Sequence, residues 1–253
     1  MISKKHLMLF SKKRTIQLFD LVGIASTCMI LIFLMGATEI NIGENNKVNT
    51  GKIVGGNCLQ GNGNVTKKQL AVGQFTDIIV DGIFKVNIIC GKKQELTITA
   101  EENLHPLISA VVKNGKLHLS TTGSYCTTNT FVADISLQSL ASITADDSSE
   151  LVVNCNSTVN DKLAIDLRGA SSMAISGIAK NVSMILQDST ELDAFQLKAE
   201  TVEIKASDAA TAHVNVSKKL IGQGSDASTI NYRGRPQRVQ VTTVDASDCS
   251  PED

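Results

Sequence analysis

The chain has 253 residues and a formal net charge of −1, from 24 basic and 25 acidic residues. A chain this close to neutrality has no overall basic field, so nucleic acid is not expected as a partner. Aromatic residues make up only 4% and Trp is absent. The length and composition therefore predict one elongated domain with a core of Val, Ile, Leu and Ala.

The N-terminus carries an apolar segment behind a basic one. The apolar stretch, over residues 21–36, is uncharged and follows Lys4, Lys5, Lys12, Lys13 and Arg14. This pattern is typical of an export signal, and Ala37 offers a small residue for cleavage. Because a transmembrane helix needs about 20 apolar residues, the stretch is short, yet it would also serve as an uncleaved anchor. A buried core helix is the third alternative.

Residues 1–37 are therefore interpreted as a signal peptide or an N-terminal membrane anchor. Residues 38–56 contain Asn, Gly and Glu and are interpreted as a linker. Residues 57–253 form the predicted folded domain. We expect an exported protein, located in the periplasm, at the outer surface or anchored in the cell envelope.

A six-residue pattern recurs through the C-terminal half at spacings of 19, 20, 18 and 19 residues. Each copy contains Gly or Asp, then two small residues, a polar residue and a mostly apolar one. An additional copy at residues 146–151 precedes the first of these, and the five others occupy residues 168–173, 187–192, 207–212, 225–230 and 244–249. Repeats of this length indicate stacked architectures, in which each unit buries its apolar face against its neighbours.

The segments between the copies alternate apolar with polar or small residues, as in residues 162–167 and 201–205. Period-two alternation predicts strands, and no window shows a convincing helical pattern. About 20 residues make one coil of two or three short strands joined by sharp corners, so we predict an all-β, right-handed parallel β-helix, or solenoid, over residues 70–249. Equivalent apolar positions should then superpose on one face, namely Leu151, Met173, Leu192, Ala212 and Ile230.

The repeated motif is interpreted as the corner of each coil. Gly tolerates a positive φ, while Asp and Ser bond their own backbone in turns. The alternative is a cation-binding row of aligned carboxylates, since like charges one coil apart repel. That row would contain Asp147, Asp188, Asp208, Asp226 and Asp245. The spacing matches neither a calcium-binding nonapeptide repeat nor an EF-hand loop, so the turn interpretation is favoured and no metal site is assigned.

Several segments together resemble a known family. Gly61-Asn62-Gly63-Asn64-Val65, residues 75–88 and Ala100-Glu101-Glu102-Asn103-Leu104-His105-Pro106 are similar to the opening of the putative auto-transporter adhesin head-GIN domain, and Arg168-Gly169-Ala170-Ser171 is similar to its repeated corners. The resemblance covers residues 52–248. It implies a β-helical domain associated with the bacterial envelope and without established catalytic residues. Several corners differ from the family in having Asp for Gly.

Five cysteines lie beyond the apolar segment: Cys58, Cys90, Cys126, Cys155 and Cys249. An exported protein can oxidise them, but an odd number leaves at least one free or intermolecular, and spacing does not assign the pairs. Cys90 continues the alternation of Phe84, Val86 and Ile88, so it is interpreted as a core thiol. No Cys/His spacing predicts a zinc site.

The sequence assembles no catalytic site. His6 is in the leader and His105 in a loop, while His118 and His213 are predicted to point outward from strands. Glu101 and Glu102 are adjacent and would face opposite sides of a strand. No nucleophile elbow, zinc-protease motif or phosphate-binding loop is present.

We therefore expect a non-catalytic envelope protein that presents a rigid surface for adhesion or macromolecular binding, without a cofactor. Its macromolecular partner and binding residues are not assigned by the sequence. The alternatives are a structural envelope component without a ligand and a β-helical polysaccharide-cleaving enzyme.

Overall fold

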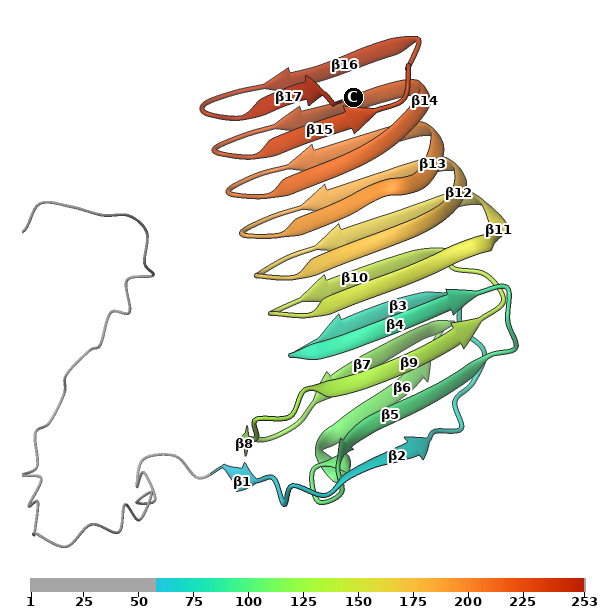
Figure 1. Ribbon diagram of the computed structural model, residues 1–253, viewed down its shortest axis with the longest axis vertical. Coiled ribbons are helices and arrows are strands. Elements are labelled where there is room, and N and C mark those ends of the chain that lie inside the picture. Colours follow the sequence, from blue (N-terminus) through green and yellow to red (C-terminus); the bar gives the residue numbers. More distant parts are fainter. Residues whose placement is uncertain (1–57, 253) are drawn as a thin grey trace, which may run out of the picture. The chain divides into compact units, whose positions relative to one another are not determined.

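The computed structural model describes residues 58–252, and its ribbon is a stack of flattened coils (Figure 1). The predicted export or anchor segment and the predicted linker lie outside the described residues. Within residues 58–252, no helix is long and apolar enough to cross a membrane.

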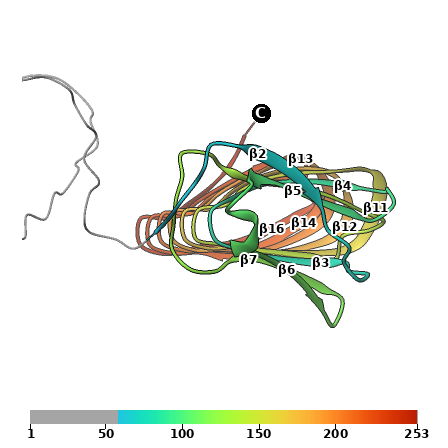
Figure 2. The same ribbon diagram turned by 90° about the horizontal axis from the view of Figure 1, so that it is seen from below.

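Each regular coil consists of one long strand that bends in its middle and closes through a tight corner. These strands are β11 (Glu150–Leu167), β12 (Ser172–Leu186), β13 (Glu191–Ala206) and β14 (Thr211–Gly224). Their first halves form one sheet, called here the first face. Their second halves form the second face, and Figure 2 shows the two faces flattened against each other. The core lies between them.

The two faces are extended by shorter strands at both ends. On the first face β11 is followed by β4 (Phe84–Cys90) and β9 (Phe131–Leu137) in one direction, and β14 by β15 (Thr229–Arg233) and β17 (Asp248–Pro251) in the other. On the second face the corresponding strands are β10 (Ser142–Asp146), β3 (Asp77–Asp81) and β7 (Lys116–Thr121) at one end and β16 (Arg238–Thr243) at the other.

The register confirms the predicted stacking of the coils. Leu151 pairs with Met173, Met173 with Leu192, Leu192 with Ala212 and Ala212 with Ile230, all in parallel strands. All five side chains are buried. Because each of these apolar positions lies directly over the next, the repeat period of the sequence becomes a continuous core.

Each coil reverses direction twice, and only one of the two reversals is a sharp corner. The sequence pattern predicts two or three short strands joined by sharp corners. The opposite reversal, called here the bend, lies inside β11, β12, β13 and β14 (Figure 1). The pairing register shifts at the bends, for example after Cys155 and between Ala174 and Ser176. Bulges of this kind turn a strand without ending it, which is why the coil length varies between repeats.

The corner interpretation of the repeated motif is confirmed. The Gly or Asp position has φ between 58° and 69° in all six copies, at Asp147, Gly169, Asp188, Asp208, Asp226 and Asp245. Asp tolerates this left-handed conformation better than most residues. The corner carboxylates also accept backbone N–H groups from the preceding coil: Asp188 Oδ2 lies 3.1 Å from the nitrogen of Gly169, and Asp208 Oδ2 lies 3.4 Å from that of Asp188.

The small corner residues form the expected inner ladder. Ser149, Ser171, Thr190, Ala210 and Ser228 are all buried at equivalent positions. Ser149 donates its hydroxyl to the carbonyl of Gly82 at 2.7 Å, and Ser228 donates to the carbonyl of Ala206 at 3.1 Å. Small side chains at these positions let the two faces approach each other at the corner.

Replacing Asp208 by Ala should lower the free energy of unfolding by about 1–2 kcal/mol, because Ala at φ 61° is strained and the carboxylate contacts are lost. Asp208→Gly should cost less, since Gly accepts this φ without strain. Urea unfolding of the full chain and both variants measures the difference. Equal losses for Ala and Gly would show that the carboxylate, not the backbone conformation, determines the choice of Asp.

The N-terminal end departs from the predicted run of parallel coils. β2 (Val65–Gln69) pairs antiparallel with β5 (Glu95–Glu101), β5 pairs antiparallel with β9, and β6 (Ile108–Lys113) forms an antiparallel hairpin with β7. The hairpin turns at Asn114 and Gly115, both with positive φ, as a two-residue Asn-Gly turn requires. The chain order is also not sequential, because β4 lies between β9 and β11.

This end is held together by the segments that resemble the family's opening. Glu101, which is buried, accepts the N–H of Gly63 at 2.6 Å and the hydroxyl of Thr127. These hydrogen bonds, that of Thr127 first, lower the pKa of Glu101. A Cβ at Gly61 would lie 2.0 Å from the Glu101 carboxylate, so this approach requires glycine. Glu102 is exposed, which confirms that the two carboxylates face opposite sides.

The Asn-Leu-His-Pro segment, expected to be a loop, contains a short 3₁₀ helix, η1 (His105–Leu107). Asn103 extends the same network, because its side chain accepts the N–H of Asn62 at 3.0 Å and donates to the carbonyl of Gln60 at 2.7 Å. The matching segments therefore have a structural role: they hold the chain across the N-terminal end of the solenoid.

Two disulfides connect distant parts of the N-terminal half. Cys58 bonds Cys126, beside the paired short strands β1 (Leu59–Gln60) and β8 (Tyr125–Cys126), and Cys90 bonds Cys155. The interpretation of Cys90 as a core thiol is therefore wrong in its chemistry, although the residue is buried as expected. Alternation along one strand cannot show that the bend of β11 brings a second cysteine against it. Cys249 is the one free cysteine among the described residues.

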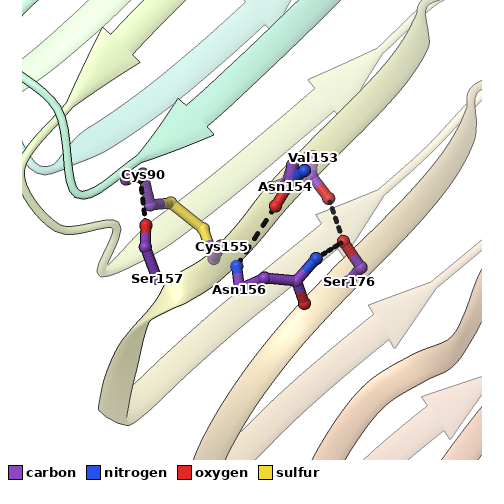
Figure 3. Close-up of a disulfide and its surroundings, with 7 residues drawn as sticks. All are labelled: Cys90, Val153, Asn154, Cys155, Asn156, Ser157 and Ser176. Carbon is purple, nitrogen blue, oxygen red and sulfur yellow. Dashed lines mark hydrogen bonds between the residues drawn. A yellow bond between two sulfur atoms is a disulfide. The ribbon is translucent and has the colours of Figure 1, made fainter.

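Figure 3 shows how the bend of β11 is held beside the second disulfide. Ser157 donates its hydroxyl to the carbonyl of Cys90 at 2.8 Å, and Asn156 donates its side-chain amide to the hydroxyl of Ser176 at 3.1 Å. The bend is thus tied to the coil on each side of it.

Candidate functional site

The bends carry a row of basic residues that the sequence analysis did not identify. This row, the basic edge, consists of Lys162, Lys180, Lys198, Lys218, Lys219, Arg235 and Arg238. A signal was present in the sequence, because Lys162, Lys180, Lys198, Lys218 and Arg238 follow one another at 18, 18, 20 and 20 residues. That is the period of the corner motif, so each coil brings basic charge to the same side.

The pairing register places these residues in more than one column. Lys162 is paired with Asn181, Asn181 with Thr201, Thr201 with Lys219 and Lys219 with Arg238, so in this column only Lys219 and Arg238 are direct neighbours. In a neighbouring column Ile178 is paired with Lys198, and Lys198 with Asn215. Successive coils are ~4.8 Å apart, so basic side chains recur along the bends on a rigid support.

Two acidic residues partly neutralise the basic edge. Lys180 lies 2.6 Å from Asp161, and Lys218 lies 2.6 Å from Glu200. The hydrogen bond and charge of Asp161 raise the pKa of Lys180. Both pairs are solvent-exposed and so add little stability. In the described part of the chain no ion pair engages the other five members, Lys162, Lys198, Lys219, Arg235 and Arg238, which leaves these five charges available.

A shallow groove of about 410 Å³ runs along the basic edge. Lys180, Lys198 and Glu200 line it with polar groups, and Ile178, whose exposed fraction is 43%, supplies an apolar part of the surface. A groove that crosses successive coils is open at both ends, so it suits an extended polymer better than a compact small molecule.

A partly buried aromatic cluster lies between the basic edge and the first face. The rings of Phe195 and His213 meet edge to face with centroids 4.8 Å apart, and the guanidinium of Arg233 lies 4.0 Å from the centroid of Phe195. The Glu252 carboxylate approaches both side chains, at 3.4 Å from His213 Nδ1 and 3.9 Å from Arg233. Because Arg233 covers the Phe195 ring, this cluster is not an open platform for sugar stacking.

The opposite side of the solenoid is acidic. The corners expose Asp146, Asp147, Asp188, Asp208, Asp226 and Asp245, with Arg168 as their basic neighbour. Among residues 58–252 no group of three or more His, Cys, Asp or Glu could hold a metal ion. The positive φ of every corner, together with the backbone contacts of the Asp188 and Asp208 carboxylates, favours the turn interpretation over the cation row. The fold therefore separates charge, with acidic corners and basic bends.

Two other grooves are weaker candidates for a binding site. A groove of about 480 Å³ on the second face has Lys205 as its one charged lining residue among those described. A groove of about 260 Å³ on the first face contains Glu150, Glu191 and Asp193 and is where the enzyme alternative would place its carboxylates. Of these, Glu150 pairs with Lys85 at 2.8 Å, and Asp193 accepts the N–H of Phe195 at 3.1 Å.

The three histidines among the described residues do not lie together in the structure. His105 is buried at η1, His118 is exposed on β7 and His213 belongs to the cluster on β14. The predicted outward orientation is confirmed for His118 and, with part of the ring covered by Phe195, for His213.

Comparison with known proteins identifies relatives of this fold. The family model described as putative auto-transporter adhesin, head GIN domain, matches residues 74–236. A putative adhesin from Bacteroides fragilis NCTC 9343 superposes with a TM-score of 0.64 at 16% identity, covering 77% of this chain and 100% of that chain. At that identity the likeness concerns the fold. No curated protein matches the chain.

Two further solved structures have lower TM-scores. A putative adhesin from Parabacteroides merdae ATCC 43184 has a TM-score of 0.47 at 18% identity, and covers 77% of this chain and 99% of that chain. A putative lipid binding protein from Parabacteroides distasonis ATCC 8503 has a TM-score of 0.44 at 16% identity, with the same coverage of 77% and 99%.

Proposed function

The chain belongs to the putative auto-transporter adhesin, head GIN domain, family, and from this premise we propose that it is a non-catalytic, exported protein of the bacterial envelope whose solenoid binds an anionic polysaccharide through the basic edge. The observation that carries the proposal is the recurrence of basic side chains on successive bends at the period of the coils. Repeated positive charge on a rigid support complements a polymer that repeats negative charge.

The basic edge suits a polysaccharide better than nucleic acid. Proteins that bind single-stranded nucleic acid stack bases on exposed aromatic rings, whereas the ring of Phe195 is covered by Arg233. Uronate or phosphate groups on a sugar polymer need only charge and hydrogen-bond donors, which Lys and Arg provide. Family membership supports placement at the envelope, where such polymers occur.

The triple variant Lys162→Gln, Lys198→Gln, Lys219→Gln tests this function. The full chain in mild non-ionic detergent should bind polygalacturonate, and the variant should bind at least about tenfold more weakly because three basic charges without an ion-pair partner among the described residues are lost. The matched control replaces the exposed residues Lys67, Lys68 and Lys113, which lie on β2 and β6, and should bind as the unchanged protein does. Isothermal titration at two salt concentrations measures both.

The outcomes separate the alternatives. Equal weakening by both triple variants would assign the binding to net charge rather than to the basic edge, and absence of binding would favour a structural component without a ligand. Cleavage of the polysaccharide, lost in Glu191→Gln without loss of folding, would favour the enzyme. Binding of an oligothymidine in place of the polysaccharide would identify nucleic acid as the partner.

A further inference from the structure

The C-terminal end of the solenoid leaves two strand edges open. β16 pairs with β14 and β17 pairs with β15, and among residues 58–252 no strand pairs with the other edge of either (Figure 1). At the N-terminal end β2 carries exposed Lys67 and Lys68 at its edge, and among the described strands β6 pairs only with β7, so its other edge is open as well. Charged side chains of this kind discourage pairing with another chain, whereas an unguarded edge invites it.

The edge of β16 presents a regular set of backbone groups. Val244, directly after β16, donates its N–H inward to the carbonyl of Gly224 at 3.0 Å. Because backbone groups alternate along a strand, the N–H and C=O groups of Val239, Val241 and Thr243 point outward. These three residues are symmetric about Val241, so an identical strand in the antiparallel direction would match all of them.

At this end the core side chains are only partly covered by the rest of the chain. Val239 continues the core column of Leu220, yet its exposed fraction is 41%, whereas Leu220 is fully buried. Val241 and Cys249 also pack against the core and are half-buried. Terminal repeats of a solenoid need either a polar outer side or a partner, and these side chains provide no polar cover.

The charges at this end select the direction in which a partner approaches. Arg235 and Arg238 lie at the bend end of β16, while Asp245 and Asp248 lie at the corner end. Rotation by 180° about an axis perpendicular to both sheets reverses the strand direction, so the bend of one copy lies beside the corner of the other. This symmetry cannot place the corners of the two copies side by side, so the acidic corners stay apart.

We propose that two copies of this chain join at their C-terminal ends about a two-fold axis through Val241, which extends both sheets across the interface. Val239 of one copy then pairs with Thr243 of the other, and Arg238 of one lies near Asp245 of the other. Glu252 lies at the bend end and opposes this complementarity, but Arg233 and His213 already engage it. Backbone pairing supplies the affinity, as in other strand additions.

The first test removes one outward donor without changing the inward pairing. Val241→Pro lacks the outward N–H and places its ring on the edge, while the inward bonds to β14 come from neighbouring residues. Val241→Ala shortens the side chain but keeps the donor. Sedimentation velocity of the full chain in mild detergent should show dimers for the unchanged protein and Val241→Ala, and a dissociation constant at least about tenfold higher for Val241→Pro.

A monomeric unchanged protein, or a dimer that Val241→Pro leaves intact, would overturn the proposal. Circular dichroism shows whether Val241→Pro is folded. If it is not, the crosslinking experiment that follows decides the matter without that variant. Both readouts concern self-association, so they stand or fall separately from polysaccharide binding.

The second test captures the two-fold register directly. Gln237→Cys and Asp245→Cys are placed together in a background with Cys28→Ser and Cys249→Ser. Within one chain these positions flank β16 on its two sides, roughly 20 Å apart at about 3.3 Å per strand residue, so they cannot bond each other. Between the proposed copies they face each other, and oxidation should produce a reducible dimer. No crosslink, or equal crosslinking by each single-cysteine variant, would contradict the register.

Discussion

Leu192→Asp is expected to lower the free energy of unfolding by about 5 kcal/mol, a large fraction of the roughly 5–15 kcal/mol that stabilises a typical domain. Leu192 is fully buried and lies between Met173 and Ala212 of the adjacent coils. The change removes the apolar side chain and puts a carboxylate without a partner into the core. Since each coil is supported only by its neighbours, the damage extends to the coils on both sides.

Urea unfolding of the full chain, followed by circular dichroism, measures this effect. Gln196→Asp is the matched control, because it introduces the same carboxylate at an exposed position of the same strand. The control should change the free energy of unfolding by less than about 0.5 kcal/mol. Similar losses for both variants would mean that Leu192 does not occupy the core of the stack.

Replacing both Cys90 and Cys155 by Ala should cost about 4 kcal/mol. Their disulfide closes a loop with a sequence separation of 65 residues, and removal of a crosslink over such a loop greatly increases the entropy of the unfolded chain. The bond also joins β4 to the bend of β11, strands that are adjacent in space but far apart in the chain.

Thermal unfolding with and without a reductant measures the contribution of both disulfides, and the double Ala variant isolates this one. Cys249→Ser is the control, because this thiol is free: its midpoint should equal that of the unchanged protein, and the reductant should lower it equally in both. An unchanged midpoint in the double variant would show that the nonlocal strand pairing needs no crosslink.

The disulfides also bear on the proposed location. Both lie in the N-terminal half, where the pairing is nonlocal, and the described coils beyond Cys155 contain none. Disulfides of this kind persist in oxidising compartments. Their presence therefore supports the proposed export, which the predicted leader over residues 1–37 would direct.

The regular coils could be predicted from the sequence because their information is local. A corner needs a positive φ, so Gly or Asp recurs wherever the chain turns, and each recurrence places Leu192 over Met173 one coil earlier. Period-two alternation then assigns the inward side chains. The same logic could have located the basic edge, since Lys180, Lys198 and Lys218 share the period, but charged residues on a bend carry no alternation signal.

The sequence by itself therefore determined the solenoid, its corners and its core positions, all of which depend on residues within one period of each other. Only the tertiary structure decided the insertion of β4 between β9 and β11 and the pairing of Cys90 with Cys155. These features depend on contacts between residues far apart in the chain. Which distant residues meet depends on side-chain packing and on the positions at which bulges turn each strand. Neither factor produces a local pattern in the sequence.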